Sequence, residues 1–428
     1  MTESSRVIVV GAGIAGLVAA RRLVLGGREV TVLEASGRAG GQLARHTVGG
    51  LELDAGAESF ATRGGTVAEL AGRLGLGDDI VRPVDSPAWL YRADGTAMPL
   101  PSTSLLGIPA VPLARDVIDA IGMRAALRAS LDLLLPSVVG AGAATLGELV
   151  RRRMGAAVLE QLVAPVVRGV HSADPDDLPV ERAAPTLRAA LHREGSLSHA
   201  VAGIRASSPA GSQVAGIRGG MVRLVDRLLA DLERFGVELR LDAAPDEVAP
   251  DHVTVGAERL DGEVVVAAPR VGDAPGSAPD AGRLISLVTL VVDRPELDAA
   301  PRGTGVLVEL GAPGVRARAL THLTAKWPWI AESAAGLHAL RLSYDGRFGG
   351  PEAISQAVAD AGVLLGIPLN APLDADVITW ERAVPRTHSV DGMHYVGEAG
   401  AGTGLAAVIA QAESEAERLL GGSPEDQG

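Results

Sequence analysis

Apolar residues near the start of the chain follow the pattern of a buried strand that leads directly into a helix. Residues 7–10 form an uninterrupted run of valine and isoleucine, and helical apolar spacing continues through residue 22. A second run, Glu29 to Leu33, reads as another strand. This order of strand, helix and strand is typical of the α/β class with a parallel sheet.

Three glycines occupy the turn between the first strand and the helix. Gly11 permits a tight turn, Gly13 lets a pyrophosphate approach the backbone, and Gly16 allows close packing of helix on strand. The N-terminus of the helix would then bind the phosphates. Glu34 ends the second strand, where a carboxylate that binds ribose hydroxyls is expected. The pattern predicts a dinucleotide site, and a glycine-rich turn without a ligand is the alternative.

Further apolar patterns predict the remaining helices and strands. A hairpin is indicated by Asp94-Gly95 between two short apolar runs. Helices are expected over residues 64–76, 115–135, 217–235 and 354–364, and strands over 89–91, 97–101, 236–241, 264–269, 284–292 and 305–310.

A second glycine-rich stretch, residues 138–145, resembles a nucleotide-binding turn. Pro136 precedes it, Thr145 stands at its last glycine position, and a helix rather than a strand follows. We interpret it as a linker, which disfavours a separate pyridine-nucleotide site and with it a reductase.

The composition narrows the possible functions. At 428 residues the chain is long enough for two or three domains, and its net charge of −13 argues against binding to nucleic acid. Only ten residues are Trp, Tyr or Phe, so a large pocket lined by aromatic rings is not expected. The chain has no cysteine, which excludes disulfides, thiolate metal sites and a cysteinyl flavin link.

The sequence lacks the patterns of a metal site, a signal peptide and a membrane-spanning helix. The nine histidines show no metal-binding spacing, so no metal is expected. The sequence has no signal-peptide pattern and no apolar run of membrane-spanning length. We therefore expect a cytoplasmic protein, with peripheral membrane contact left open.

Residues 34–42 and 51–60 carry a family resemblance. The first contains Arg38 and a Gly-Gly pair, and the second reads Leu-Glu-Leu-Asp-Ala-Gly-Ala-Glu-Ser-Phe. The pattern resembles the flavin-binding amine-oxidase superfamily, and within it the protoporphyrinogen and coproporphyrinogen oxidases. The resemblance implies that the Arg38 turn wraps the FAD pyrophosphate and that the loop from Gly56 to Ser59 passes the flavin ring.

The C-terminal region resembles the superfamily's second FAD motif. The resemblance implies that residues 393–398 form a strand that delivers Glu398 toward the ribityl hydroxyls, and that residues 402–409 turn into a helix whose N-terminus faces the flavin. The chain departs from the family at Glu398, where relatives often have Asp or Ala. The helix that usually precedes this motif in the family is missing, and only residues 388–392 lie in the gap.

The stretch from residue 146 to residue 175 resembles the porphyrinogen oxidases more closely than the amine oxidases. It combines an arginine-rich helix with a Gly-Val-aromatic-x-Gly-Asp-Pro-like segment, from which the chain departs at His171 and Ala173. We interpret Arg151 to Arg153 as a solvated helix face.

Lys326 is the only lysine in the chain and lies in Thr-Ala-Lys-Trp-Pro. In related amine oxidases a lysine in this region reaches flavin N5 through a water, so the resemblance implies a catalytic role. A surface lysine beside a structural Trp-Pro is the alternative.

The resemblance assigns the cofactor to residues from both ends of the chain. Val248 stands where the family's backbone contacts adenine, or is an ordinary edge-strand valine. The expected FAD-binding residues are Gly11, Ala12, Gly13, Ile14, Ala15, Gly16, Glu34, Ala35, Arg38, Gly41, Gln42, Gly56, Ala57, Glu58, Ser59, Val248, Trp380, Glu398, Thr403, Gly404 and Leu405.

Substrate propionates need cationic partners, and the planar fork of arginine suits carboxylates. Arg63, which follows the flavin loop, is the first candidate. Arg45, Arg168 and His171 are the others.

These interpretations give a discontinuous organisation. A Rossmann-like FAD-binding domain comprises residues 1–85, 215–275 and 385–428. A mixed-sheet substrate domain comprises 86–102 and 276–384, and a helical domain comprises 103–214.

The resemblance implies oxygen-dependent oxidation of coproporphyrinogen III with non-covalently bound FAD, which belongs to haem biosynthesis. Protoporphyrinogen oxidation is the nearest alternative. A flavin amine oxidase, a desaturase and an inactive FAD-binding protein of haem assembly stay open. The expected partners are the porphyrinogen, oxygen and, as a further possibility, a membrane surface or another enzyme of the pathway.

Overall fold

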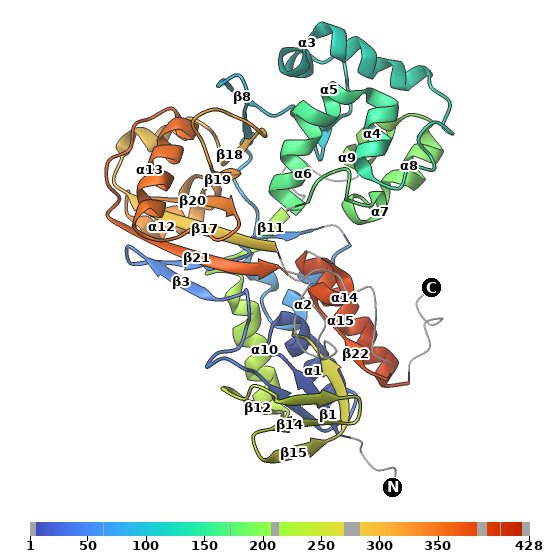
Figure 1. The fold of residues 1–428 in the computed structure, drawn as a ribbon, viewed down its shortest axis with the longest axis vertical. Coiled ribbons are helices and arrows are strands. Elements are labelled where there is room, and N and C mark those ends of the chain that lie inside the picture. Colours follow the sequence, from blue (N-terminus) through green and yellow to red (C-terminus); the bar gives the residue numbers. More distant parts are fainter. Residues whose placement is uncertain are drawn as a thin grey trace. The chain divides into compact units, whose positions relative to one another are not determined.

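The computed structural model describes residues 6–62, 64–171, 173–206, 214–268, 283–382, 392–402 and 404–421 (Figure 1). They belong to two compact units. Unit 1 contains Met1–Arg82, Val214–Ile285 and Thr379–Gly428, and unit 2 contains Pro83–Gln213 and Ser286–Ile378. Most of the predicted substrate part and nearly all of the predicted helical part therefore fall in unit 2. No helix in these ranges combines the length and apolar character that a membrane span needs.

A five-stranded parallel sheet forms the centre of unit 1. Its strand order is β12-β2-β1-β16-β22, and each neighbouring pair is parallel. The strands are β12 (Glu238–Arg240), β2 (Val30–Leu33), β1 (Val7–Val10), β16 (Glu263–Val266) and β22 (His394–Tyr395). The sheet joins the N-terminal, middle and C-terminal segments of the chain, as a discontinuous α/β fold requires.

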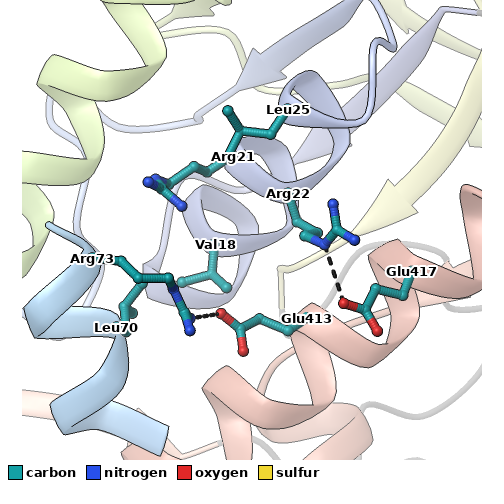
Figure 2. Close-up of a pocket in the computed structure, with 8 residues that line it drawn as sticks. All are labelled: Val18, Arg21, Arg22, Leu25, Leu70, Arg73, Glu413 and Glu417. Carbon is teal, nitrogen blue, oxygen red and sulfur yellow. Dashed lines mark hydrogen bonds and ion pairs between the residues drawn. The ribbon is translucent and has the colours of Figure 1, made fainter. Parts of the chain in front are cut away.

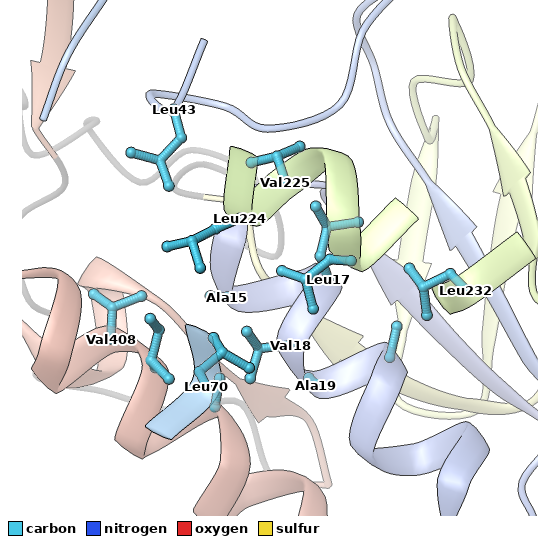
Figure 3. Packing of buried hydrophobic residues seen from close by; sticks show 14 of the residues in the cluster. Ala15, Leu17, Val18, Ala19, Leu43, Leu70, Leu224, Val225, Leu232 and Val408 are labelled. Atoms are coloured by element: carbon cyan, nitrogen blue, oxygen red, sulfur yellow. The ribbon is translucent and has the colours of Figure 1, made fainter. Parts of the chain in front are cut away.

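The two faces of β1 enter different hydrophobic cores because successive side chains point to opposite sides of a strand. Val7 and Val9 share one core with helices, whereas Ile8 and Val10 share another with a small antiparallel sheet. Figure 3 shows part of the helical core. Its helices are α1 (Ile14–Leu25), α2 (Thr66–Arg73), α10 (Val222–Arg234) and α15 (Leu405–Leu419). The small sheet consists of β13 (Glu247–Ala249), β14 (His252–Val255) and β15 (Glu258–Asp261).

A seven-stranded mixed sheet forms one part of unit 2. Its strand order is β21-β17-β20-β19-β18-β7-β8, and β7 and β8 pair as the predicted hairpin. Helix α13 (Pro351–Leu365) contributes Ala353, Ala357 and Leu364 to the core of this sheet. The strands are β21 (Asp374–Arg382), β17 (Arg283–Val292), β20 (His338–Asp345), β19 (Ala319–His322), β18 (Gly305–Val308), β7 (Trp89–Tyr91) and β8 (Ala97–Pro99).

Helices form the other part of unit 2 around a separate core. The long helix predicted over 115–135 is shorter and kinked. Helix α3 (Arg115–Ser130) breaks at Gly122, whose φ of +79° is not helical, and a 3₁₀ turn, η2 (Leu131–Leu134), follows it. The other helices include α4 (Leu146–Met154), α6 (Ala164–His171), α8 (Leu187–Glu194) and α9 (Leu197–Ala206).

The prediction that Arg151 to Arg153 form a solvated helix face is wrong for Arg153. Its side chain is fully buried and pairs with the equally buried Asp132 of η2. The remaining guanidinium hydrogens are donated to backbone carbonyls, among them that of Gly195 at 3.1 Å. Asp132 in turn accepts the N–H and hydroxyl of Ser198 at 2.7 and 2.8 Å, at the start of α9. The pair therefore connects η2, α4 and α9 with every charge satisfied.

Breaking this pair is expected to be costly, because the remaining charge would be buried without its partner. We predict that Arg153→Met lowers the free energy of unfolding by about 3–5 kcal/mol. Arg152→Met, which removes an exposed partner of Glu148, should cost less than about 1 kcal/mol. Denaturant unfolding followed by circular dichroism measures both, and equal losses would show that the buried pair has no special importance.

Candidate functional site

The first glycine turn has the geometry that its spacing predicts. Gly11 has a φ of +105°, which only glycine adopts readily, and a Cβ on Gly16 would overlap the carbonyl oxygen of Gly11. Helix α1 therefore lies very close to the end of β1. Gly13 is the N-cap of α1, and the first turn of the helix contains no acidic residue that would repel an anion.

Gly13 differs from its neighbours because nothing in the described chain requires a glycine there. Its φ is −68° and its ψ is 172°, which any L-residue can adopt. A Cβ at this position would meet no atom of the described residues within 4 Å. The space in front of Gly13 is thus open, as the approach of a phosphate to the backbone requires.

The carboxylate of Glu34 stabilises the first glycine turn through hydrogen bonds. One of its oxygens accepts the N–H of Ala12 at 2.8 Å, and the other accepts the N–H and hydroxyl of Ser36 at 3.0 and 2.8 Å. A carboxylate has about four acceptor positions, so three donors leave it able to accept another hydroxyl. The neighbouring Ala35 is exposed.

The second glycine loop lies directly against the first. The N–H of Gly40 donates to the carbonyl of Ala12 at 2.8 Å, and a Cβ on Gly41 would lie 3.3 Å from Cα of Gly13. The exposed Arg38 donates from Nη1 to the carbonyl of Gly41 at 3.0 Å. The structure thus brings the two predicted phosphate-binding turns together.

A third predicted loop packs on the second. A Cβ on Gly56 would overlap the carbonyl oxygen of Gln42, so the two backbones are in direct contact. Trp380 lies far away in sequence but donates from Nε1 to the carbonyl of Ala55 at 3.0 Å. The loop continues through Ala57, Glu58 and Ser59.

The C-terminal motif reaches the same place. The amide of Gln42 approaches a carboxylate oxygen of Glu398 at 3.5 Å. A Cβ on Gly397 would lie 3.4 Å from the Cβ of Ala15, which follows Ile14 in the first turn of α1. Gly404, with a φ of +114°, precedes Leu405 at the start of α15.

Gln411 is a residue of this site that the sequence analysis missed. From α15 it accepts the N–H of Gly397 at 3.2 Å and donates to the carbonyl of Tyr395 at 2.7 Å, so it holds the turn that carries Glu398. The only signal in the sequence is an uncharged polar residue within an apolar helical run.

One predicted residue lies in the small antiparallel sheet, and several others lie outside the described ranges. Val248 pairs with Val253 in the small antiparallel sheet. Arg63, Thr403 and the gap at 388–392 lie mostly or wholly outside the described residues, as does the side chain of His171.

The other substrate candidates already have ionic partners. Arg45 forms an exposed ion pair with Asp226 at 2.5 Å in unit 1. Arg168 pairs with Asp174 at 2.6 Å in unit 2. A substrate carboxylate would have to compete with these acids.

Lys326 belongs to unit 2, at the end of the one-turn helix α11 (Leu323–Lys326). Its Nζ lies 5.3 Å from the centre of the Trp327 ring, within the range of a cation–π contact.

A cavity of about 280 Å³ opens between α1, α2 and α15 (Figure 2). Its charged groups already have partners, since Arg73 binds Glu413, Arg22 binds Glu417 at 3.2 Å and Arg21 binds Asp231 at 2.7 Å. Burial raises the pKa of Glu413, although Arg73 opposes the shift. The lining residues of α1 begin at Val18, beyond the glycine turn, so this cavity is not the candidate cofactor site.

Comparisons with known proteins agree with the gathered motifs. Residues 14–274 match the family of flavin-containing amine oxidoreductases. A coproporphyrinogen III oxidase of Mycobacterium bovis is 30% identical over 400 residues, which cover 88% of this chain and 86% of that protein. The mitochondrial protoporphyrinogen oxidase of Nicotiana tabacum is 31% identical over 201 residues, covering 46% of this chain and 38% of that one.

Solved structures show the same fold. An Exiguobacterium protein provisionally named protoporphyrinogen oxidase has a TM-score of 0.83 and 24% identity, and the match covers 98% of this chain and 99% of that one. A putrescine oxidase bound to putrescine has a TM-score of 0.65 and 15% identity, with 97% and 98% covered. The predicted resemblance is confirmed, and the chain belongs to the family of flavin-containing amine oxidoreductases.

Proposed function

We propose that unit 1 binds FAD without a covalent link and that the protein oxidises coproporphyrinogen III to coproporphyrin III. The observation that carries the FAD proposal is the open space at Gly13, beside two further glycine loops and the N-terminus of α1. The name and 88% coverage of the mycobacterial relative support the choice of substrate.

Different residues of the site would bind different parts of the cofactor. The backbone at Gly13 and Gly41, with Arg38, would bind the pyrophosphate, and the remaining acceptor position of Glu34 would take a ribose hydroxyl. Glu398, on the turn that Gln411 holds through Gly397, would face the ribityl chain. The absence of cysteine removes the cysteinyl form of covalent attachment.

When bound, FAD would supply hydride acceptance and transfer of electrons to oxygen. The overall reaction removes six electrons and consumes three molecules of oxygen, with three of hydrogen peroxide released. This chain would contribute cations for the substrate propionates, for which Arg63, Arg45, Arg168 and His171 remain predictions. Lys326 would supply a charged amine beside the reacting centre.

Contact with a membrane surface or a pathway enzyme remains a prediction. Met123, Leu127, Leu131 and Leu134 are exposed and spaced along one face of α3 and η2. Residues 120–138 also present Arg124 and Arg128, while their one carboxylate, Asp132, is buried. An anionic lipid surface fits this combination best.

Gly13→Asp tests the cofactor site. The backbone and packing accommodate the side chain, but its charge would stand where we place the pyrophosphate. We expect a folded protein that retains less than about a tenth of the wild-type flavin, which corresponds to about 1.4 kcal/mol or more of binding free energy. Gly72→Asp in α2, also at an open position, is the control and should keep its flavin. The measurement is the flavin content of each variant after gel filtration. Equal retention of flavin by both variants would contradict the assignment of the pyrophosphate site to Gly13.

Incubation with coproporphyrinogen III under air tests the substrate. Porphyrin fluorescence and hydrogen peroxide should appear together, and faster than with protoporphyrinogen IX. Putrescine serves as the amine control, because the putrescine oxidase shares the fold. A flavin-loaded protein that turns over amines but no porphyrinogen would refute the proposed activity, and one that turns over neither would favour a role in haem assembly.

Lys326→Met tests the proposed role of the lysine. Reoxidation of the chemically reduced flavin by oxygen should slow by on the order of 10²-fold, as expected for the loss of a positioned acid–base group. Stopped-flow absorbance measures the rate, with Lys326→Arg as the variant that keeps the charge. An unchanged rate in Lys326→Met would show that the lysine has no such role.

A further inference from the structure

The segment that carries Lys326 is too short to hold its own shape. Strand β19 ends at His322, and α11 is a single turn from Leu323 to Lys326. An isolated helical turn is unstable because it gains one hydrogen bond for several fixed dihedral angles. Contacts from other elements must therefore hold it. One is the bond from the N–H of Val84 to the carbonyl of Lys326, at 2.9 Å.

Two buried histidines supply a second set of contacts. His322 is 1% exposed and His338, at the start of β20, is 6% exposed. Nε2 of His322 lies 3.1 Å from Nδ1 of His338, and the hydroxyl oxygen of Thr324 lies 3.5 Å from the same Nδ1. His338 thus contacts both the residue before α11 and a residue within it.

An exposed carboxylate determines where the protons lie. Oδ1 of Asp298 is 3.2 Å from Nε2 of His338, a charge contact without the geometry of a hydrogen bond, and the Asp298 side chain is 72% exposed. A carboxylate only accepts, so it favours a proton on Nε2 of His338 and leaves Nδ1 as the acceptor. His322 must then donate from its Nε2, which leaves its own Nδ1 without a proton. That Nδ1 is buried and has no hydrogen-bond partner within the described part of the chain.

We infer that the charge contact of Asp298 with His338 and the hydrogen bond between His338 and His322 fix the proton positions on both imidazoles and thereby orient the turn carrying Lys326. His338 is then a positioning residue that acts on Lys326 through His322 and Thr324. This inference rests on the proposed role of Lys326.

These proton positions require both His322 and His338 to be neutral. Burial lowers the pKa of His322 to about 4, and the nearby His338 adds to the shift. Burial also lowers the pKa of His338, against the opposing effects of Asp298 and Asp293. A proton added to Nδ1 of His338 would remove the acceptor of His322 and Thr324. The arrangement is therefore intact at neutral pH and is lost as the pH falls below the pKa of His338.

Asp298→Asn removes the charge that faces His338 and keeps the size of the side chain. Asparagine keeps the size of the side chain and an acceptor oxygen, but the negative charge that raises the pKa of His338 is gone. We expect the titration of His338 and the acid limb of flavin reoxidation to move together to lower pH, by up to about one pH unit. Glu296→Gln, which removes an exposed carboxylate two positions away, is the control and should leave both unchanged.

Nuclear magnetic resonance of protein with ¹⁵N-labelled histidine gives a readout that does not depend on activity. We expect His322 in the Nε2–H form, with the resonances assigned by His322→Gln and His338→Gln. His322 in the Nδ1–H form, or no shift of the His338 titration in Asp298→Asn, would overturn the inference. A wild-type reoxidation rate in Lys326→Met would instead remove the role of the lysine and leave the proton positions untouched.

Discussion

The contact between α1 and β1 is the constraint on which the rest of unit 1 depends. Because Gly16 has no Cβ, the helix can lie against the carbonyl of Gly11, which places its N-terminus at the end of the central strand. The loop at Gly40 then hydrogen-bonds to Ala12, and the turn at Gly397 packs against Ala15. Segments separated by hundreds of residues meet at one helix terminus, which is where a phosphate anion is most strongly stabilised.

The two units obtain stability in different ways. In unit 1 the parallel sheet is buried on both faces, so mainly aliphatic side chains fill its cores, with Phe60 as a buried aromatic member. In unit 2 a buried ion pair, Arg153 with Asp132, connects three helical elements. Such a pair is sensitive to the loss of either partner, because the desolvation of both charges is offset only when all their hydrogen bonds form.

The sequence predicted the local elements of unit 1 well because glycine spacing and apolar runs report on neighbouring residues. It also predicted that Glu34, Gly41, Gly56 and Glu398 would gather, but only through the family resemblance. Arg153 was misplaced because an arginine in a charged run gives no sign that a distant aspartate is buried opposite it. The His322–His338 contact joins two strands of a sheet and was invisible for the same reason. Gln411 acts through backbone groups, which no side-chain pattern reveals.

The central claim is that the two ends of this chain together bind one flavin nucleotide. The visible absorption spectrum of the purified protein tests it most directly. We expect the bands of oxidised flavin, with one FAD per chain released on denaturation. A colourless protein that cannot be reconstituted with FAD would contradict the account.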